Sequence, residues 1–274
     1  EAKKNGLKVD TVAGAVKGAD VVMVLIPDEV QGDVYKAEIE PNLKEGAALE
    51  FAHGFAITFG TIKPPKTVDV IMMAPKAPGP MERKVFLEGF GVPALIAVEQ
   101  DHTGKAKSIA LALAKGLGST KAGVLETNFR EEATSDLFGE QAVLCGGVTA
   151  LINAGFQTLV KRGYQPEIAY FECLHEVKLI VDLIYSGGMM NMWRSVSNTA
   201  EFGGLTTRDL VINQESKAAM EKMLDRICSG EFAKEWLDDA KKGMPRMKAL
   251  EKAEGESQVE KVGTEIRALF ESKK

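Results

Sequence analysis

Four short apolar runs in the first half of the chain limit its fold more than any other feature. Strands that are buried on both faces of a parallel sheet are almost continuously apolar, and turn residues bound them. Helical or loop segments separate the runs, so the sequence predicts an α/β fold. The runs cover residues 21–26, 46–51, 68–73 and 93–98, and a helix at about 103–117 and a short strand near 123–127 follow them.

The second half of the chain is predicted to be helical throughout. From about residue 128 onward, apolar residues recur with the 3.6-residue period of an amphipathic helix. We therefore predict a doubly wound, Rossmann-type dinucleotide-binding domain over residues 1–127 and an all-α domain over residues 128–274. The predicted helices of the second domain cover residues 131–162, 166–185, 217–229, 233–242 and 260–271.

The first domain lacks the glycine-rich turn that normally binds a dinucleotide. That turn, Gly-x-Gly-x-x-Gly, follows the first strand of a doubly wound domain and holds the pyrophosphate. No such turn precedes Val21. Residues 89–94 approach the spacing, but they come before a strand, and Pro93 has no N–H to offer a phosphate. We expect the dinucleotide domain to be incomplete, without its N-terminal strands.

Charge and cysteine content exclude several classes of partner. The 34 Lys and Arg residues against 39 Asp and Glu residues give a formal net charge of −5, so no basic field predicts binding to nucleic acid or to a membrane surface. Three widely spaced cysteines fit a reducing compartment, and we expect a cytoplasmic protein with buried thiols. They are Cys145, Cys173 and Cys228.

Residues 141–160 carry no charge and are long enough to span a membrane. Their polar residues argue against a span, because Gln141, Thr149, Asn153 and Gln157 recur on one face of the helix. The interpretation here is a deeply packed helix of a soluble protein.

Two pairs of carboxylates lie one helical turn apart, Asp136 with Glu140 and Glu172 with Glu176. Such pairs are common on solvated faces, where they have no function. Here each row continues into uncharged residues, such as Val143 in the first row, so we expect both pairs to face the interior. Buried carboxylates need a cation, and carboxylate ligands without clustered His or Cys suit Mg²⁺. Two close ions that share one carboxylate are a plausible arrangement.

Three further residues are candidates on position. His53 follows the second apolar run, at the strand end where open α/β sheets bind ligands, although a lone histidine is more often structural. Lys76 lies in a Pro- and Gly-rich loop after the third run; a sharp turn explains that loop, but the lysine could hold a carboxylate or a phosphate. Ser197 belongs to a hydroxyl-rich segment, and most such segments are caps or turns.

Several motifs together resemble one enzyme family. Asp-Leu-Phe-Gly-Glu-Gln at 136–141 with Cys-Gly-Gly at 145–147, then residues 170–176 and 196–201, occur in the order and spacing of ketol-acid reductoisomerase of the short, class I form. Residues 51–55 and 74–79 add matching motifs in the first half. The resemblance covers nearly the whole chain.

This resemblance implies an enzyme of valine, leucine and isoleucine synthesis that uses Mg²⁺ and NADPH. Its substrates, the 2-hydroxy-3-keto acids 2-acetolactate and 2-aceto-2-hydroxybutyrate, undergo an alkyl migration, and a hydride then reduces the new ketone to a 2,3-dihydroxy acid. The resemblance also implies a knotted helical domain that pairs with a second copy, in a homodimer or a larger assembly of dimers.

The same resemblance assigns roles to individual residues. Asp136 would bridge two Mg²⁺ ions, Glu140 would bind one of them, and Glu172 and Glu176 would serve the second ion across the subunit interface. Ser197 would bind the substrate carboxylate. His53 would be the active-site histidine, and Lys76 would support the metal cluster, so that catalytic roles fall on His53, Lys76 and Glu140. The positions that match the cofactor site are Asp28, Glu29, Val30, Gln31 and Gly79.

Two alternatives stay open at this point. A 3-hydroxyacid-type dehydrogenase also joins a dinucleotide domain to helices, but it needs no metal, so its activity would survive chelation. A folded scaffold fragment that cannot bind the cofactor would show no saturable binding of NADPH.

Overall fold

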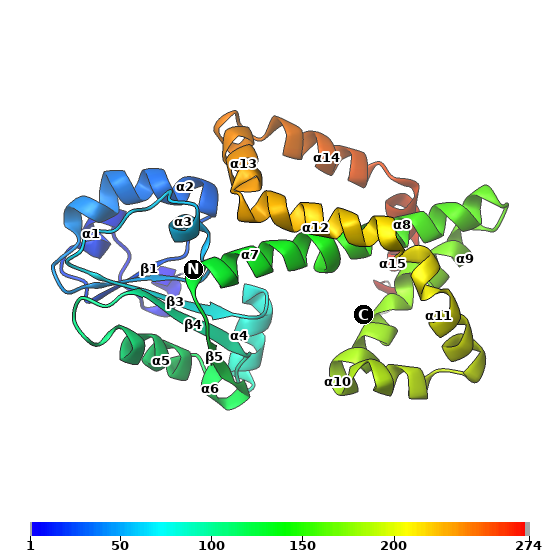
Figure 1. The fold of residues 1–274 in the computed structure, drawn as a ribbon, viewed down its shortest axis with the longest axis horizontal. Coiled ribbons are helices and arrows are strands. Elements are labelled where there is room, and N and C mark those ends of the chain that lie inside the picture. Colours follow the sequence, from blue (N-terminus) through cyan, green and yellow to red (C-terminus); the bar gives the residue numbers. More distant parts are fainter. Residues whose placement is uncertain (1, 272–274) are drawn as a thin grey trace. The chain divides into compact units, whose positions relative to one another are not determined.

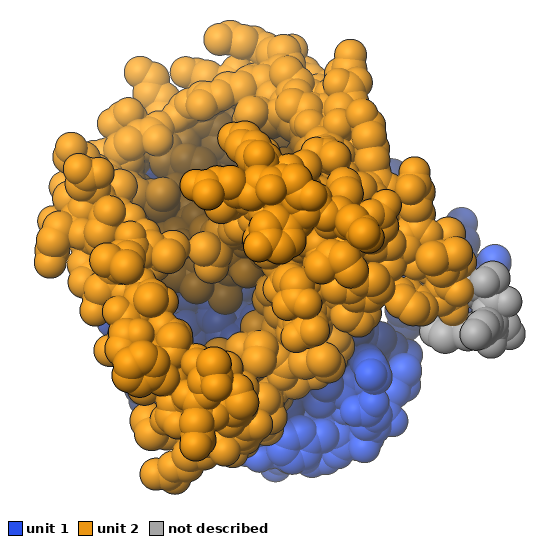
Figure 2. Space-filling view, turned by 90° about the vertical axis from the view of Figure 1, so that its right-hand side faces the viewer, with its two compact units in different colours: residues 1–136 blue, residues 137–274 orange. Residues whose placement is uncertain are grey.

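The computed structural model describes residues 2–271. The chain divides into two compact units, Glu1–Asp136 and Leu137–Lys274, which Figure 2 distinguishes by colour. The first unit therefore extends nine residues beyond the boundary predicted after residue 127, because the first turns of one helix belong to it.

A five-stranded sheet forms the centre of the first unit, with the strand order β1-β2-β3-β4-β5 (Figure 1). β1, β2 and β3 run parallel, and Val22 pairs with Leu49, which pairs with Val70. The strands are β1 (Val21–Val24), β2 (Ala48–Phe51), β3 (Asp69–Pro75), β4 (Ala94–Gln100) and β5 (Val124–Glu126). The predicted α/β class, with a Rossmann-type domain followed by a helical domain, is confirmed.

The direction of one strand, β4, differs from the predicted all-parallel sheet. β4 is antiparallel to β3, and β5 is parallel to β4. The connection from β3 to β4 contains only the short helix α4 (Gly79–Leu87), which buries no residue and so covers neither face of the sheet. The backbone N–H of Lys76 donates to the carbonyl of Pro93 at 2.8 Å. This bond holds the two ends of the connection together, so β4 starts at the edge where β3 ends.

Both faces of the sheet are covered, as the apolar runs predicted (Figure 1). On one face, Leu49 and Met72 pack with side chains from α1 (Val12–Val16), the π-helical turn Tyr35–Ile39 that continues α2 (Asp28–Val34), and α3 (Phe55–Thr58). On the other face lies α5 (Ala106–Gly116), which buries an alanine at every fourth position. Because alanine is small, the helix lies close to the strands. Two 3-10 turns, Ala2–Asn5 and Glu40–Asn42, and α6 (Ser119–Ala122) complete this unit.

Residues 89–93 form the loop that leads into β4, so the glycine pair precedes a strand, as the sequence indicated. Gly91 lies against the backbone of Gly118, so close that a Cβ there would come within 2.2 Å of its carbonyl carbon. Packing between two loops thus explains this glycine.

The second unit is helical, and most helices match predicted segments. Two were missed, α11, whose start was interpreted as a hydroxyl-rich cap or turn, and α14. The helices are α7 (Phe129–Gly139), which begins in the first unit, α8 (Gly146–Lys161), α9 (Pro166–Tyr170), α10 (Val177–Ser195), α11 (Asn198–Val211), α12 (Gln214–Cys228), α13 (Glu231–Lys241), α14 (Pro245–Gly255) and α15 (Gln258–Glu271).

Two π-helical turns interrupt the long helices that the sequence predicted as regular. One covers Glu140–Leu144 between α7 and α8, and the other covers Phe171–His175 between α9 and α10. In both, an N–H bonds five residues back, from Cys145 to Glu140 and from Glu176 to Phe171. Such turns are rare and occur often at functional sites. Here each one contains a residue of the predicted metal site, Glu140 or Glu172.

Residues 141–160 are not deeply packed against the rest of this chain, so that prediction is wrong. Within the described residues, the stretch Phe129–Lys161 is the one helical segment with the length and composition of a membrane span, and 6% of its most apolar window is buried. The core of this unit is small and joins α8, α9 and α15 around Phe156 and Tyr170. A periodic apolar face indicates that a helix packs against a partner surface. It does not show whether that surface belongs to the same chain or to another one.

The expectation of buried thiols is also wrong. Cys145 is exposed, and Cys173 and Cys228 are half-buried.

Candidate active site

The carboxylate of Glu132, on the first turn of α7, is the centre of a polar cluster in the first unit. Its side chain is 1% exposed. One oxygen, Oε1, accepts a hydrogen bond from Lys76 Nζ at 2.8 Å. The other, Oε2, lies 3.0 Å from His53 Nδ1 and accepts the backbone N–H of Gly54 at 2.8 Å. Both oxygens therefore have hydrogen-bond partners within the protein.

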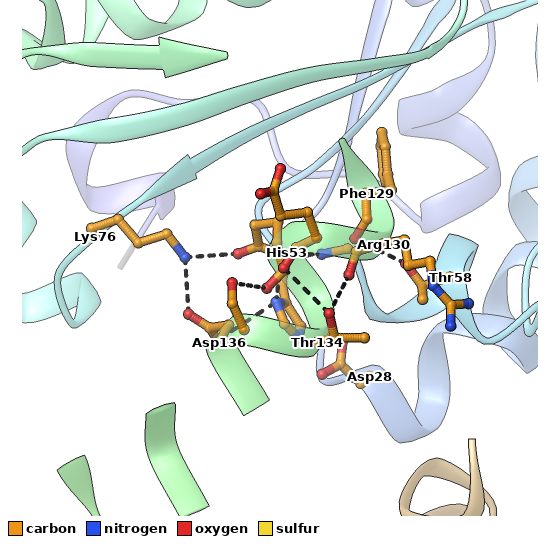
Figure 3. Close-up of polar contacts among 12 residues, drawn as sticks. Asp28, His53, Thr58, Lys76, Phe129, Arg130, Thr134 and Asp136 are labelled. Carbon is orange, nitrogen blue, oxygen red and sulfur yellow. Dashed lines mark hydrogen bonds and ion pairs between the residues drawn. The ribbon is translucent and has the colours of Figure 1, made fainter. Parts of the chain in front are cut away.

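Lys76 joins this buried carboxylate to Asp136, one helical turn further along α7. Its Nζ donates to Asp136 Oδ1 at 2.9 Å, and Figure 3 shows the lysine extending to that oxygen. The other oxygen, Oδ2, lies 3.7 Å from His53 Nδ1. The side chain of Asp136 is 31% exposed, so it remains accessible to a ligand.

A close approach between backbones positions His53. Gly54 lies so near α7 that a Cβ would come within 2.4 Å of the carbonyl oxygen of Phe129. The same oxygen accepts the Thr58 hydroxyl at 2.9 Å (Figure 3). The loop after β2 thus contacts the start of α7 at both ends of α3, through Gly54 and Thr58.

The charges of the cluster stabilise one another. Burial raises the pKa of Glu132, but hydrogen bonds and charges from His53 and Lys76 outweigh burial and lower that pKa to about 2. Burial lowers the pKa of His53 and of Lys76, and the neighbouring carboxylates outweigh it and raise both. The cluster therefore favours an ionised Glu132 between two cationic groups.

Four of the residues predicted for the cofactor site occupy the first turn of α2. Burial raises the pKa of Asp28, which also feels the charge of His53. Gln31 is buried and donates to the Ile26 carbonyl at 2.8 Å and to Asp28 Oδ1 at 3.1 Å. The fifth residue, Gly79, stands at the start of α4 with open space where a Cβ would be. Glu29 and Val30 are the other two residues of the turn.

The donor set around Asp136 fits a hard divalent cation in part. His53, Glu132 and Asp136 each offer a ligand atom, and these atoms lie within 4.8 Å of one another. Glu132 already binds three donors, so Asp136 is the member with an exposed carboxylate oxygen. Carboxylate oxygens are ligands that Mg²⁺ prefers.

The other predicted metal ligands belong to the second unit, and their predicted burial is wrong. Glu140, Glu172 and Glu176 are exposed in this chain. The apolar residues that continue their rows are exposed too, including Leu151 at 53% and Leu179 at 57%. The rows were interpreted correctly as apolar, but they face away from the core of their own chain.

Ser197 is the N-cap of α11. Its Oγ accepts the backbone N–H of Ala200 at 3.2 Å, and the residue is exposed.

Sequence reasoning missed Glu132, the most buried residue of the cluster. A signal was present, because Glu132 precedes Asp136 by four residues and extends the same row toward the N-terminus. The predicted row extends only from Asp136 toward the C-terminus.

Two family descriptions match the chain. The NADPH-binding domain of acetohydroxy acid isomeroreductase matches residues 1–123, and the C-terminal domain of ketol-acid reductoisomerase matches residues 129–272. The chain is 56% identical over 269 residues to a ketol-acid reductoisomerase (NADP(+)) of Methanocaldococcus jannaschii, with 98% of this chain and 82% of the relative covered.

Solved structures agree with this similarity. An NADH-preferring ketol-acid reductoisomerase from an uncultured archaeon has a TM-score of 0.96 at 53% identity, covering 98% of this chain and 81% of the other. A putative oxidoreductase from Jannaschia sp. CCS1 has a TM-score of 0.61 at 14% identity and covers 84% of this chain and 82% of the other. That second likeness concerns the fold alone.

Proposed function

The chain belongs to the ketol-acid reductoisomerase family, and we propose that it converts 2-acetolactate or 2-aceto-2-hydroxybutyrate to the 2,3-dihydroxy acid with NADPH as reductant. It is thus an oxidoreductase with isomerase activity. We assign it to the biosynthesis of branched-chain amino acids in the cytoplasm.

The observation that carries this proposal is the cluster of Lys76, His53 and Asp136 around the buried Glu132. It combines an accessible carboxylate with two cationic groups whose positions are fixed. Ligands of open α/β sheets gather at the carboxyl ends of the strands, where His53 and Lys76 follow β2 and β3.

Asp136 and Glu140 would hold Mg²⁺, with Glu172 and Glu176 completing a site for two ions. Bound there, the ions would act as Lewis acids on the neighbouring oxygens of the substrate. Lys76 Nζ donates to Asp136 Oδ1 at 2.9 Å and so holds that carboxylate in position. Ser197, the N-cap residue of α11, would bind the substrate carboxylate.

His53 is suited to hold a proton at the substrate. Its Nδ1 faces Glu132, so its Nε2 is the nitrogen left for a substrate oxygen. Glu132 fixes the ring, as the carboxylate partner of a catalytic histidine commonly does. Together with Lys76, Glu132 therefore orients the groups that touch substrate or metal.

NADPH would bind along the first turn of α2 and beside Gly79. The residues concerned are Asp28, Glu29, Val30, Gln31 and Gly79. Val30 is 41% exposed, and Gly79 leaves open space, which suits an extended ligand at this edge.

We further propose that a second copy of the chain covers the exposed apolar rows of the second unit. Leu151, Leu179 and Tyr185 are largely exposed, the last at 91%. Exposed apolar surface on this scale marks an interface. In the dimer, or a larger assembly of dimers, Glu172 and Glu176 would serve the site of the partner subunit.

The test follows NADPH oxidation and dihydroxy acid formation with 2-acetolactate, with and without Mg²⁺. We expect turnover that EDTA abolishes and Mg²⁺ restores, and we expect Asp136→Asn to lose it while exposed Asp33→Asn keeps it. Turnover that survives chelation would favour the metal-independent dehydrogenase instead. Absence of saturable NADPH binding would favour a scaffold fragment.

A further inference from the structure

Glu50, on β2, is a carboxyl group that the proposed reaction does not yet use. It is 0% exposed and lines a cavity of about 270 Å³. Its Oε1 accepts the backbone N–H of Met73 at 3.2 Å. Its Oε2 is buried and has no hydrogen-bond partner among the described residues. A buried acceptor without a donor costs free energy, so a ligand that donates a hydrogen bond would be stabilised here.

Glu82, on the first turn of α4, supplies a second acceptor to the same cavity. Its Oε1 is likewise buried without a partner within residues 2–271. Gly79, which we place in the cofactor site, lines the cavity as well. Two acceptor oxygens from different elements therefore border one part of the proposed cofactor site.

The position of the cavity indicates which end of the cofactor would lie there. Ala52 lines the cavity and directly precedes His53. Pro75 lines it too and directly precedes Lys76. Because a hydride passes from the nicotinamide to the substrate, the nicotinamide must lie beside the groups that touch substrate and metal. The nicotinamide end, and not the adenine end, therefore belongs beside Glu50.

The remaining walls suit a ring with one polar substituent. Met23, Leu25, Met73 and Leu117 supply apolar surface to the cavity. Pockets for small ligands combine such surface with a few polar groups that fix orientation. The carboxamide on the nicotinamide ring has an NH2 group with two N–H donors, one for each of the two acceptor oxygens.

We propose that Glu50 and Glu82 bind the nicotinamide end of the cofactor by accepting hydrogen bonds from its carboxamide NH2, an assignment that rests on the proposed function. Glu50 accepts through Oε2 and Glu82 through Oε1, the two oxygens without partners in the chain. These residues determine the affinity for the carboxamide and make no contact with the adenine end.

Calorimetric titration of the protein with three reduced dinucleotides tests the proposal. One is NADPH, the second is its 3-acetylpyridine analogue, in which a methyl group replaces the carboxamide NH2, and the third is its hypoxanthine analogue, which lacks the adenine amino group. We expect the acetylpyridine analogue to bind at least about 10-fold more weakly than NADPH, and the hypoxanthine analogue to bind about as tightly as NADPH. Equal affinity for NADPH and the acetylpyridine analogue would overturn the proposal, and so would a loss confined to the hypoxanthine analogue.

Variants connect this discrimination to the two acids. Glu50→Gln keeps an oxygen for the N–H of Met73 and presents an NH2 group, which cannot accept, to the cavity. It should weaken NADPH binding at least about 10-fold and bring the affinities for NADPH and the acetylpyridine analogue close together. Exposed Glu88→Gln, the control, should keep the wild-type ratio of the two affinities. Full discrimination in folded Glu50→Gln would overturn the proposal.

Glu82→Gln covers the case in which Glu50→Gln does not fold, because α4 buries no residue and tolerates a change on its surface. This variant should also reduce the discrimination, and an unchanged ratio would contradict the proposal. NADPH that binds and supports turnover, yet is not distinguished from the acetylpyridine analogue, would overturn the roles of Glu50 and Glu82 alone. Absence of saturable binding by all three dinucleotides would overturn the proposed function as well.

Discussion

The carboxylate of Glu132 accepts the backbone N–H of Gly54 at 2.8 Å, so a side chain of α7 fixes the loop that carries His53. The same carboxylate binds Lys76, which follows β3. One buried carboxylate therefore links α7 to the loop after β2 and to the residue after β3. Its removal should affect all three segments.

Glu132→Gln should lower kcat about 100-fold, because the amide can still accept from Gly54 but no longer balances the charges of His53 and Lys76. Loss of a buried charged partner should also reduce the free energy of unfolding by about 2 kcal/mol. Steady-state assays and urea unfolding measure the two effects. The matched control is Glu251→Gln on the exposed side of α14, which should change neither. Wild-type kcat in Glu132→Gln would show that the carboxylate charge is dispensable.

Gly54→Ala should impair both folding and activity, because its Cβ would meet the Phe129 carbonyl oxygen at 2.4 Å. Shifting the backbone to relieve this contact should cost about 1–3 kcal/mol and displace His53. Gly116→Ala in α5 is the control, since a Cβ there meets nothing within 4 Å. Thermal unfolding and kcat report the result. If the two variants behave alike, the close approach does not determine the loop position.

Glu50→Gln should stabilise the protein at pH 8 and have little effect at pH 4. Burial raises the pKa of folded Glu50 from 4.5 to about 7, so the unfolded chain releases this proton first as pH rises. The contribution of Glu50 to stability is therefore present below about pH 4.5 and is lost between there and about pH 7. The variant lacks this titration, and the gain at pH 8 should be on the order of 3 kcal/mol. Urea unfolding at both pH values, beside exposed Glu221→Gln, measures the difference; an equal effect at both would argue against a proton at Glu50.

Leu151→Asp or Leu179→Asp should dissociate the proposed dimer and abolish activity, since a charge would enter an apolar interface that also brings Glu172 to the site. Sedimentation velocity measures the mass, and circular dichroism the helix content. Leu87→Asp provides the control on the first unit, where the leucine is 67% exposed. Dimers that persist with full turnover in both variants would place the interface elsewhere.

The strands were predictable because burial on two faces leaves a strong signal in sequence. β1 begins at Val21 and β2 ends at Phe51, as the apolar runs indicated. The direction of β4 left no such signal. The direction of β4 depends on whether the connection through α4 crosses a face of the sheet. An apolar run has the same pattern in a parallel and in an antiparallel strand.

The candidate site was predictable in part. Strand ends pointed to His53 and Lys76, and helical spacing pointed to Asp136, and the structure brings these three together. Glu132 was missed because a single buried acid looks like any other glutamate until its partners are known. The exposure of Glu140 was mispredicted, since helical periodicity cannot distinguish the core of one chain from contact with another.

The π-helical turns at Glu140–Leu144 and Phe171–His175 make these helices hard to replace by regular ones. Each turn holds an additional residue, and one residue corresponds to a rotation of about 100° around the helix axis. Deleting a single amino acid from either turn would restore ordinary hydrogen bonding, yet it would swing every later side chain to another side. A redesign that idealises the backbone here would gain regularity and lose the direction in which Glu176 points.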